Sequence, residues 1–173
     1  MDKWARRLEG DYYALLSLDH DAERNEAFGR GRRCVAELEA LLALPLSEDQ
    51  RAAVSSARAR IDQALAEFAS PAQRAAYDAT IGNFRGILRC MSEGLRLDEL
   101  RQLRGKHLST RPRNETAAML KAVSAIAHLK SGQLQTALAE YEAALALDPL
   151  NRELFGAYIP LKRRLTRERE EGS

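Results

Sequence analysis

The chain has 173 residues, of which 45% are hydrophobic and 30% are charged, and this composition is typical of one globular domain or two small ones. Its apolar runs are far shorter than the ~20 residues of a membrane-spanning helix, and Met1 to Trp4 lack an apolar signal core, so we expect a cytoplasmic protein without membrane contact. The net charge of +2 is too small to favour a nucleic-acid partner through long-range attraction.

The first third of the chain predicts short helices followed by a helical hairpin. Trp4 and Leu8, then Tyr12, Leu15 and Leu16, fall at helical spacing around a break at Gly10 and Asp11, and we expect Trp4 to anchor the first helix in a core. A longer helix is predicted from Ala22 to about Leu44, and the helix after it begins at the capping box Ser47 to Gln50 and runs to Phe68. The apolar face of the longer helix is expected to contain Phe28, Val35, Leu38, Leu41 and Leu42.

The stretch from Ser70 to Asp78 predicts the start of another helix. Ser70 is a suitable cap, Pro71 suits the first helical position, and Gln73 stands three residues after the cap. The preceding helix reaches this cap with little linker, so we expect a sharp corner. The segment from Asp11 to Asp19 is the expected packing partner of that corner.

These two phrases, Asp-Tyr-Tyr-x-x-Leu near the start and Ser-Pro-x-x-Arg-x-x-Tyr-Asp at the corner, resemble those of a J-domain over roughly residues 10–82. J-domains are helical modules of co-chaperones that stimulate the ATPase of DnaK-type chaperones through a His-Pro-Asp tripeptide. That tripeptide is absent, and the place expected for it, Ala36 to Leu38, reads as continuous helix. The resemblance therefore implies a J-like module without ATPase stimulation.

The resemblance also implies a partner-binding basic face on the second helix of the module. Its members here are Arg24, Arg30, Arg32 and Arg33. The alternative interpretation is a solvated, arginine-rich helix face.

Two connecting helices are expected next, one around Phe84 to Met91 and one around Leu95 to Leu108. A cluster of basic residues lies at the end of the second, which is favourable for the helix dipole, and it leaves open nucleic-acid binding as a less favoured alternative. The segment from Arg111 to Asn114 is predicted to be a loop and a module boundary. The basic residues are Arg101, Arg104, Lys106, His107, Arg111 and Arg113.

Residues 115–130 and 133–147 predict a helical hairpin with its turn at Ser131 and Gly132. Small or aromatic residues at Ala125, Ala137, Tyr141 and Ala144, followed by Pro149, resemble one tetratricopeptide repeat. A closing helix, kinked at Pro160, is expected over residues 151–169. The resemblance implies partner binding on the first helix of the hairpin, with core packing as the alternative. The binding residues would be Met119, Ala122, Ile126, Leu129 and Lys130.

The sequence thus predicts an all-α fold with a J-like module over 1–82, connecting helices over 83–112, and a repeat hairpin with its closing helix over 113–173. No constellation of residues for catalysis, cofactor binding or metal binding is recognisable, so the chain is not expected to be an enzyme. The favoured function is a protein-interaction adaptor with another protein as partner. The alternatives are a co-chaperone that binds a DnaK-type chaperone and a nucleic-acid-binding protein.

Overall fold

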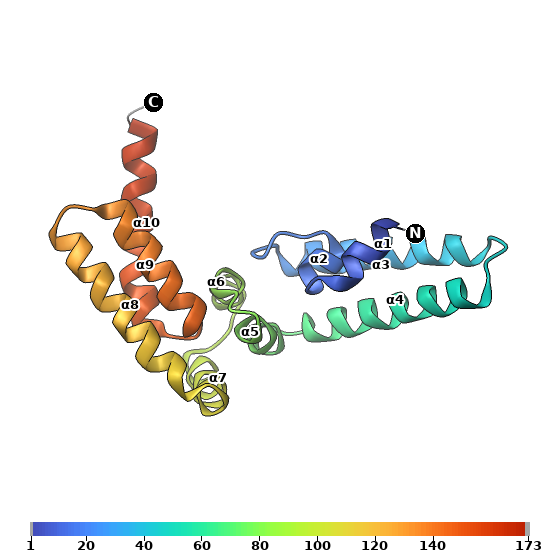
Figure 1. Cartoon of the computed structure of the whole chain (residues 1–173), viewed down its shortest axis with the longest axis horizontal. Coiled ribbons are helices and arrows are strands. Elements are labelled where there is room, and N and C mark those ends of the chain that lie inside the picture. The colour runs from blue at the N-terminus through green and yellow to red at the C-terminus, as the bar shows by residue number, and fades with distance from the viewer. Residues whose placement is uncertain (1, 172–173) are drawn as a thin grey trace.

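The computed structural model describes residues 2–171, and this part of the chain folds into ten helices and no strand (Figure 1). The predicted all-α class is therefore confirmed. In chain order the helices are α1 Asp2–Glu9, α2 Tyr12–Leu16, α3 Arg24–Leu42, α4 Glu48–Glu67, α5 Pro71–Thr80, α6 Phe84–Ser92, α7 Leu97–Thr110, α8 Pro112–Lys130, α9 Leu134–Leu147 and α10 Arg152–Glu171.

Helices α3 and α4 form the predicted hairpin, which extends to one side of the molecule (Figure 1). Ser47 caps α4 in a complete capping box, because its hydroxyl accepts from the Gln50 amide while the Gln50 side chain accepts from the Ser47 amide. The two helices approach closely at Gly31, where an added Cβ would lie 2.7 Å from the Leu65 side chain. The absence of a side chain at Gly31 therefore allows α3 and α4 to lie close together.

The buried face of α3 differs from the predicted one. It consists of Ala27, Gly31, Cys34 and Leu38. Of the five residues expected on this face only Leu38 is buried; Phe28, Val35 and Leu41 are half-buried, and Leu42 is exposed. The large apolar residues flank a stripe of small ones because α3 lies close against its neighbours, which leaves little room along the line of contact.

The N-terminal helix α1 is held by its tryptophan, as predicted. Trp4 is only 8% exposed and the Arg7 guanidinium lies over its ring, 4.2 Å from the centroid. Arg7 also donates to the Leu15 carbonyl at 2.8 Å and to the Cys34 thiol at 3.0 Å. One side chain thus joins α1 to both α2 and α3.

The corner between α4 and α5 forms as predicted. Ser70 caps α5 and accepts from the Gln73 amide at 3.2 Å, and Pro71 occupies the first turn. In Figure 1, α5 and α6 lie between the hairpin on one side and α8, α9 and α10 on the other. The corner therefore connects the two halves of the molecule.

Helices α8, α9 and α10 form the C-terminal part. The turn between α8 and α9 contains Gly132 at φ 73°, a left-handed conformation that favours glycine. The predicted small and aromatic positions Ala125, Ala137, Tyr141 and Ala144 are all buried. Helix α10 covers this hairpin, and it continues through the exposed Pro160.

The predicted loop from Arg111 to Asn114 is wrong. Helix α7 ends at Thr110 and α8 begins at Pro112, so Arg111 alone separates them. Proline suits the first turn of a helix, because the amide hydrogen that it lacks would have no partner there. The Arg-Pro pair that was interpreted as a loop is instead a tight junction between two helices.

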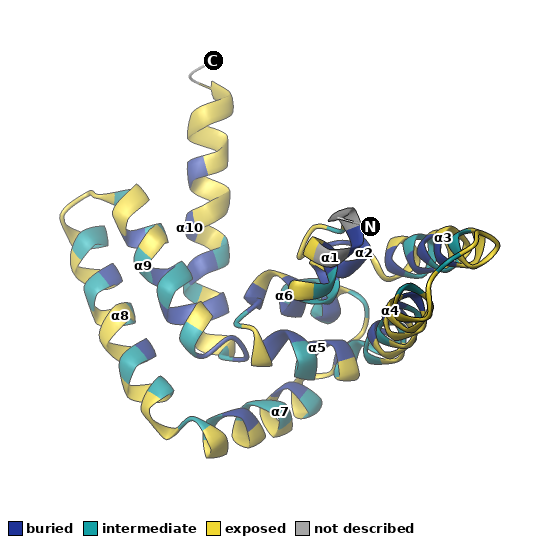
Figure 2. Ribbon diagram, turned by 45° about the vertical axis from the view of Figure 1, so that its right-hand side comes forward, coloured by how far each residue is buried: buried dark blue, intermediate teal, exposed yellow. Residues whose placement is uncertain are grey.

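Buried residues, which are dark blue in Figure 2, divide into two hydrophobic clusters. One contains residues from Trp4 to Phe68, and the other contains residues from Ala75 to Leu165. The division falls at the α4–α5 corner, so α6 packs mainly with the C-terminal cluster. Packing clusters do not define independently folding units, so the predicted boundaries at 82 and 112 stay predictions.

Across residues 2–171, no helix combines the length and the apolar character that crossing a bilayer requires.

Candidate functional site

The two phrases that carry the J-like resemblance meet at a buried polar cluster. Tyr13 on α2 donates its hydroxyl to Asp78 Oδ1 on α5 at 2.7 Å, and Arg74 Nε donates to the same tyrosine oxygen at 3.0 Å. All three side chains are at most 1% exposed. Beside them, the Tyr12 ring stacks on Tyr77 with centroids 4.4 Å apart. The predicted pairing of the two segments is therefore confirmed.

Asp78 is the buried carboxyl group of this cluster. Burial raises the pKa of its carboxyl to about 6, although hydrogen bonds from Tyr13 and Asn83 and the nearby Arg74 act in the opposite direction. Asn83 donates to Asp78 Oδ1 at 2.9 Å and to the His20 carbonyl at 2.8 Å. A Cβ at Gly86 would come within 2.2 Å of Asp78 Oδ2. The cluster is closed to solvent and joins α2, α5 and α6, so its evident role is to hold these helices together.

The four arginines predicted to form one basic face are distributed around α3. Arg24, Arg32 and Arg33 are exposed, and the spacing of 100° per residue directs them to different sides of the helix. Arg30 is half-buried and donates to the Leu16 carbonyl at 2.9 Å, which ties it to the end of α2. The structure therefore does not bring the four together in one patch, and their binding of a partner stays a prediction.

The place expected for the tripeptide lies inside a regular helix. Residues 36–38 belong to α3, well before its end at Leu42. The loop between α3 and α4 comes several residues later, at positions 43–47.

The first helix of the repeat hairpin, α8, carries an exposed apolar stripe. Met119 is 60% exposed and Ile126 is 45% exposed, so neither is a core residue. Leu120 and Val123, which the sequence analysis did not single out, are 65% and 59% exposed. We name these four residues the α8 stripe.

The other residues predicted for this face behave differently. Ala122 and Leu129 are half-buried and pack against the C-terminal core, which supports the core interpretation for these two. Lys130 is exposed at the end of the helix. The spacing that would have found the α8 stripe is present in the sequence, because Met119, Val123 and Ile126 recur at intervals of four and three residues.

The basic cluster of the connecting region is divided by ion pairs. Arg104 binds the buried Asp148 through Nε at 2.9 Å and Nη2 at 2.6 Å, and it also reaches Glu115 at 3.0 Å. These contacts fix α7 against the turn between α9 and α10. Arg101, Lys106 and Arg113 are exposed, whereas Arg104 is bound to Asp148 and His107 is buried, so the six residues do not all belong to one exposed basic surface.

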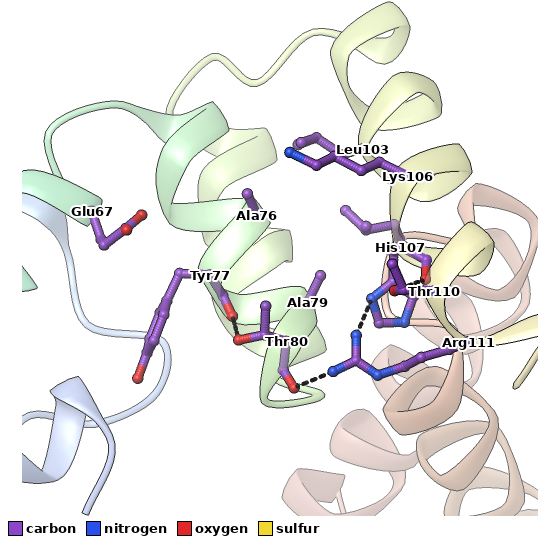
Figure 3. Close-up of a pocket in the computed structure, with 11 residues that line it drawn as sticks. Glu67, Ala76, Tyr77, Ala79, Thr80, Leu103, Lys106, His107, Thr110 and Arg111 are labelled. Atoms are coloured by element: carbon purple, nitrogen blue, oxygen red, sulfur yellow. Dashed lines mark hydrogen bonds between the residues drawn. The ribbon is translucent and has the colours of Figure 1, made fainter.

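A cleft of about 370 Å³ lies between α5 and α7 (Figure 3). Arg111 on its edge lies 3.3 Å from His107 Nδ1 and donates to the Thr80 carbonyl at 3.4 Å. Burial lowers the pKa of His107, so its ring is neutral near pH 7. Lys106 and Arg111 give the mainly apolar cleft a cationic edge, and Glu67 also lines it. The apolar part is lined by Ala76, Ala79, Leu103 and Leu150.

Comparison with known proteins gives one relationship. No family model and no solved structure match the chain. The chain is 36% identical over 163 residues to a protein of Myxococcus xanthus named serine/threonine-protein kinase Pkn1. This similarity covers 94% of the chain but only 24% of the kinase, so the chain spans about a quarter of the length of that relative.

The prediction that the chain is not an enzyme is wrong on this comparison. Nearly the whole chain is related to part of a protein that is named as a protein kinase. That prediction was based on the absence of a recognisable catalytic motif from the sequence. A segment that corresponds to a quarter of a longer protein need not contain the catalytic motif of that protein.

Proposed function

We propose that this chain is a protein-interaction module of a kinase-related protein and that it docks a partner on the α8 stripe. The observation that carries the proposal is the exposure of Met119, Leu120, Val123 and Ile126 on one helix, at 45% to 65% each. Contiguous apolar patches of this kind mark interaction sites when they occur on folded proteins. The resemblance of α8 and α9 to a tetratricopeptide repeat, whose first helix is the usual docking helix, supports the same surface.

The test compares the proteins that bind to three forms of the chain, each produced in cells of the organism from which the chain comes. The double variant Leu120→Glu, Val123→Glu places two charges on the stripe, and it should fold normally because both residues are exposed. Leu97→Glu is the matched control, since Leu97 is a 41% exposed leucine on α7. Proteins captured by the wild type and the control should be lost with the double variant. Equal capture by all three forms would exclude the α8 stripe.

A second candidate function is participation in protein phosphorylation, and the name of the relative from Myxococcus xanthus favours it. We propose that proteins held at the α8 stripe are phosphorylated by the kinase polypeptide to which this chain is related. The measurement is phosphate transfer from ATP to serine and threonine of the captured proteins. The rate of phosphate transfer to these proteins should be lower with the double variant than with the wild type. An unchanged rate would contradict this role.

A further inference from the structure

The α8 stripe has the spacing of a helix–helix seam. Thr116, Met119, Val123, Ile126 and Lys130 follow one another at intervals of three, four, three and four residues. This alternation places all five along one line of the helix and is the pattern of positions a and d in a coiled coil. The core residues Ala118 and Ala125 lie on the opposite side of α8. The seam therefore faces outward, where α8 forms the edge of the C-terminal part (Figure 1).

We infer that the occupant of this seam is α8 of a second copy of the chain, paired antiparallel about a two-fold axis near Val123. This inference rests on the proposed docking function of the α8 stripe and names its partner. The seam is complementary to itself in that orientation. Val123 would lie opposite its own counterpart and Thr116 opposite Lys130 of the other copy, while Ile126 would lie opposite Leu120, which flanks the seam, and Met119 opposite Ala127.

Charge supports the antiparallel orientation. Lys130 is exposed at one end of the seam, and Glu115 lies at the other end, where 61% of its side chain is accessible although one of its oxygens is already paired with Arg104 at 3.0 Å. An antiparallel pair brings Lys130 of each copy beside Glu115 and Thr116 of the other. A parallel pair would place the two Lys130 side chains together, and like charges at such a contact are unfavourable.

The expected dimer is weak and reversible. One helical face from each copy is at the low end of protein interfaces, below about 1,200 Å² of total buried surface, where transient complexes are found. The α8–α9–α10 core is complete in each copy, so dimer formation requires no rearrangement of the fold. The apparent mass should therefore rise with protein concentration.

The first test measures the mass of the purified full chain by sedimentation from low micromolar to submillimolar concentration. The wild type and the Leu97→Glu control should dimerise reversibly, and Val123→Glu should remain a monomer. A wild type that is monomeric at every concentration would overturn the inference. If the wild type is monomeric but captures cellular proteins that the Leu120→Glu, Val123→Glu variant does not capture, the docking function survives and the partner is another protein.

The second test determines orientation by disulfide formation, and it is specific because both natural cysteines are buried. Val123→Cys should cross-link to itself upon oxidation. Ile126→Cys should not cross-link to itself, but it should do so with Leu120→Cys when the two variants are mixed. Disulfides require Cα atoms about 4.4–6.8 Å apart, which only facing positions provide. Self-cross-linking of Ile126→Cys with none in the mixture would overturn the antiparallel arrangement.

Discussion

At the scale of single residues, Asp78 connects the two segments that made the J-like pattern recognisable. It accepts from Tyr13 and Asn83 while Arg74 Nε lies 3.6 Å from its second oxygen. A tyrosine, an arginine and an aspartate that look like surface residues in the sequence are thus buried together. Each of the three takes part in a hydrogen bond inside the closed site, from Arg74 to Tyr13 and from Tyr13 to Asp78.

The raised pKa of Asp78 predicts a pH dependence of stability. An unfolded carboxyl titrates near 3.8, whereas the folded one titrates at about 6, so between these values the folded state binds more protons. The stability that Asp78 contributes should be fully present at acid pH and be lost as the pH rises through about 6. The advantage of the wild type over Asp78→Asn should therefore fall between pH 4 and 7, by at most about 3 kcal/mol at 1.36 kcal/mol per pKa unit.

Urea unfolding of both proteins at several pH values gives this difference directly, because other titrating groups cancel. Asp62→Asn is a suitable control, since that carboxyl is 59% exposed on α4. A difference between wild type and Asp78→Asn that does not change with pH would contradict the assignment.

The sequence was sufficient to place Trp4 in a core and Ser70 at a helix cap, because both depend on local patterns. It was not sufficient for Arg104 or Arg30, which were interpreted as members of basic clusters. Their partners are Asp148 and the Leu16 carbonyl, 44 and 14 residues away in the chain. Whether an arginine is free or paired depends on tertiary contacts that spacing does not reveal.

At the scale of elements, Arg104 forms the ion pair that joins α7 to the turn after α9. The Arg104 guanidinium forms three hydrogen bonds with the buried Asp148, and Asn151 supplies another at 2.9 Å. Arg104→Ala would leave a buried carboxylate without its cation. Because Arg104 is itself 30% exposed, we expect a loss near the lower end of the range for broken buried pairs, about 3 kcal/mol.

Arg104→Lys should have an intermediate effect, because an ammonium cannot reproduce the two-pronged contact of a guanidinium. Arg101→Ala is the matched control on the same helix, and as an exposed residue it should change stability by less than about 0.5 kcal/mol. Urea unfolding would measure all three. If Arg101→Ala were as destabilising as Arg104→Ala, the ion pair would not be the cause.

Helix existence was predictable throughout, and the errors concern where elements meet. Pro112 was interpreted as part of a loop although it is also a favoured first residue of a helix, and only the packing of α8 decides between these readings. The face of α3 was misassigned for a related reason. Its large apolar residues suggested the core, but close contact with α4 required Gly31 and Cys34 along the line of approach.

At the scale of the whole molecule, two hydrophobic clusters are joined across the α4–α5 corner. The connections include the Tyr12–Tyr77 stack, the Tyr13–Asp78 hydrogen bond and the Asn83 contact with the His20 carbonyl. Arg89 adds a hydrogen bond to the Asp21 carbonyl at 3.0 Å. The sequence predicted the two ends of this junction from the paired phrases. It could not predict that the cores divide between Phe68 and Ala75, because that depends on which helices α6 contacts.

These connections predict that the two clusters unfold together. Trp4 is the only tryptophan, so its fluorescence reports on the N-terminal cluster, whereas far-UV circular dichroism reports on all helices. In the wild type the two urea transitions should coincide, as in a two-state protein. Tyr77→Ala removes the ring that stacks on Tyr12 and the hydroxyl that accepts from the Tyr12 amide at 2.8 Å. In that variant the fluorescence transition should move to lower urea, and the dichroism transition should become biphasic.

Ile81→Ala provides the control for this coupling, because Ile81 is a 40% exposed apolar residue that follows α5 and belongs to neither cluster. Its two transitions should remain coincident. Separate transitions in the wild type would show that the junction does not couple the clusters, whereas coincident transitions in Tyr77→Ala would mean that the contacts other than the Tyr12–Tyr77 stack are enough to couple them. The double variant Tyr13→Phe, Tyr77→Ala decides this second case, because it also removes the hydroxyl that α2 donates to Asp78. If its transitions still coincide, the direct contacts between α2 and α5 do not carry the coupling.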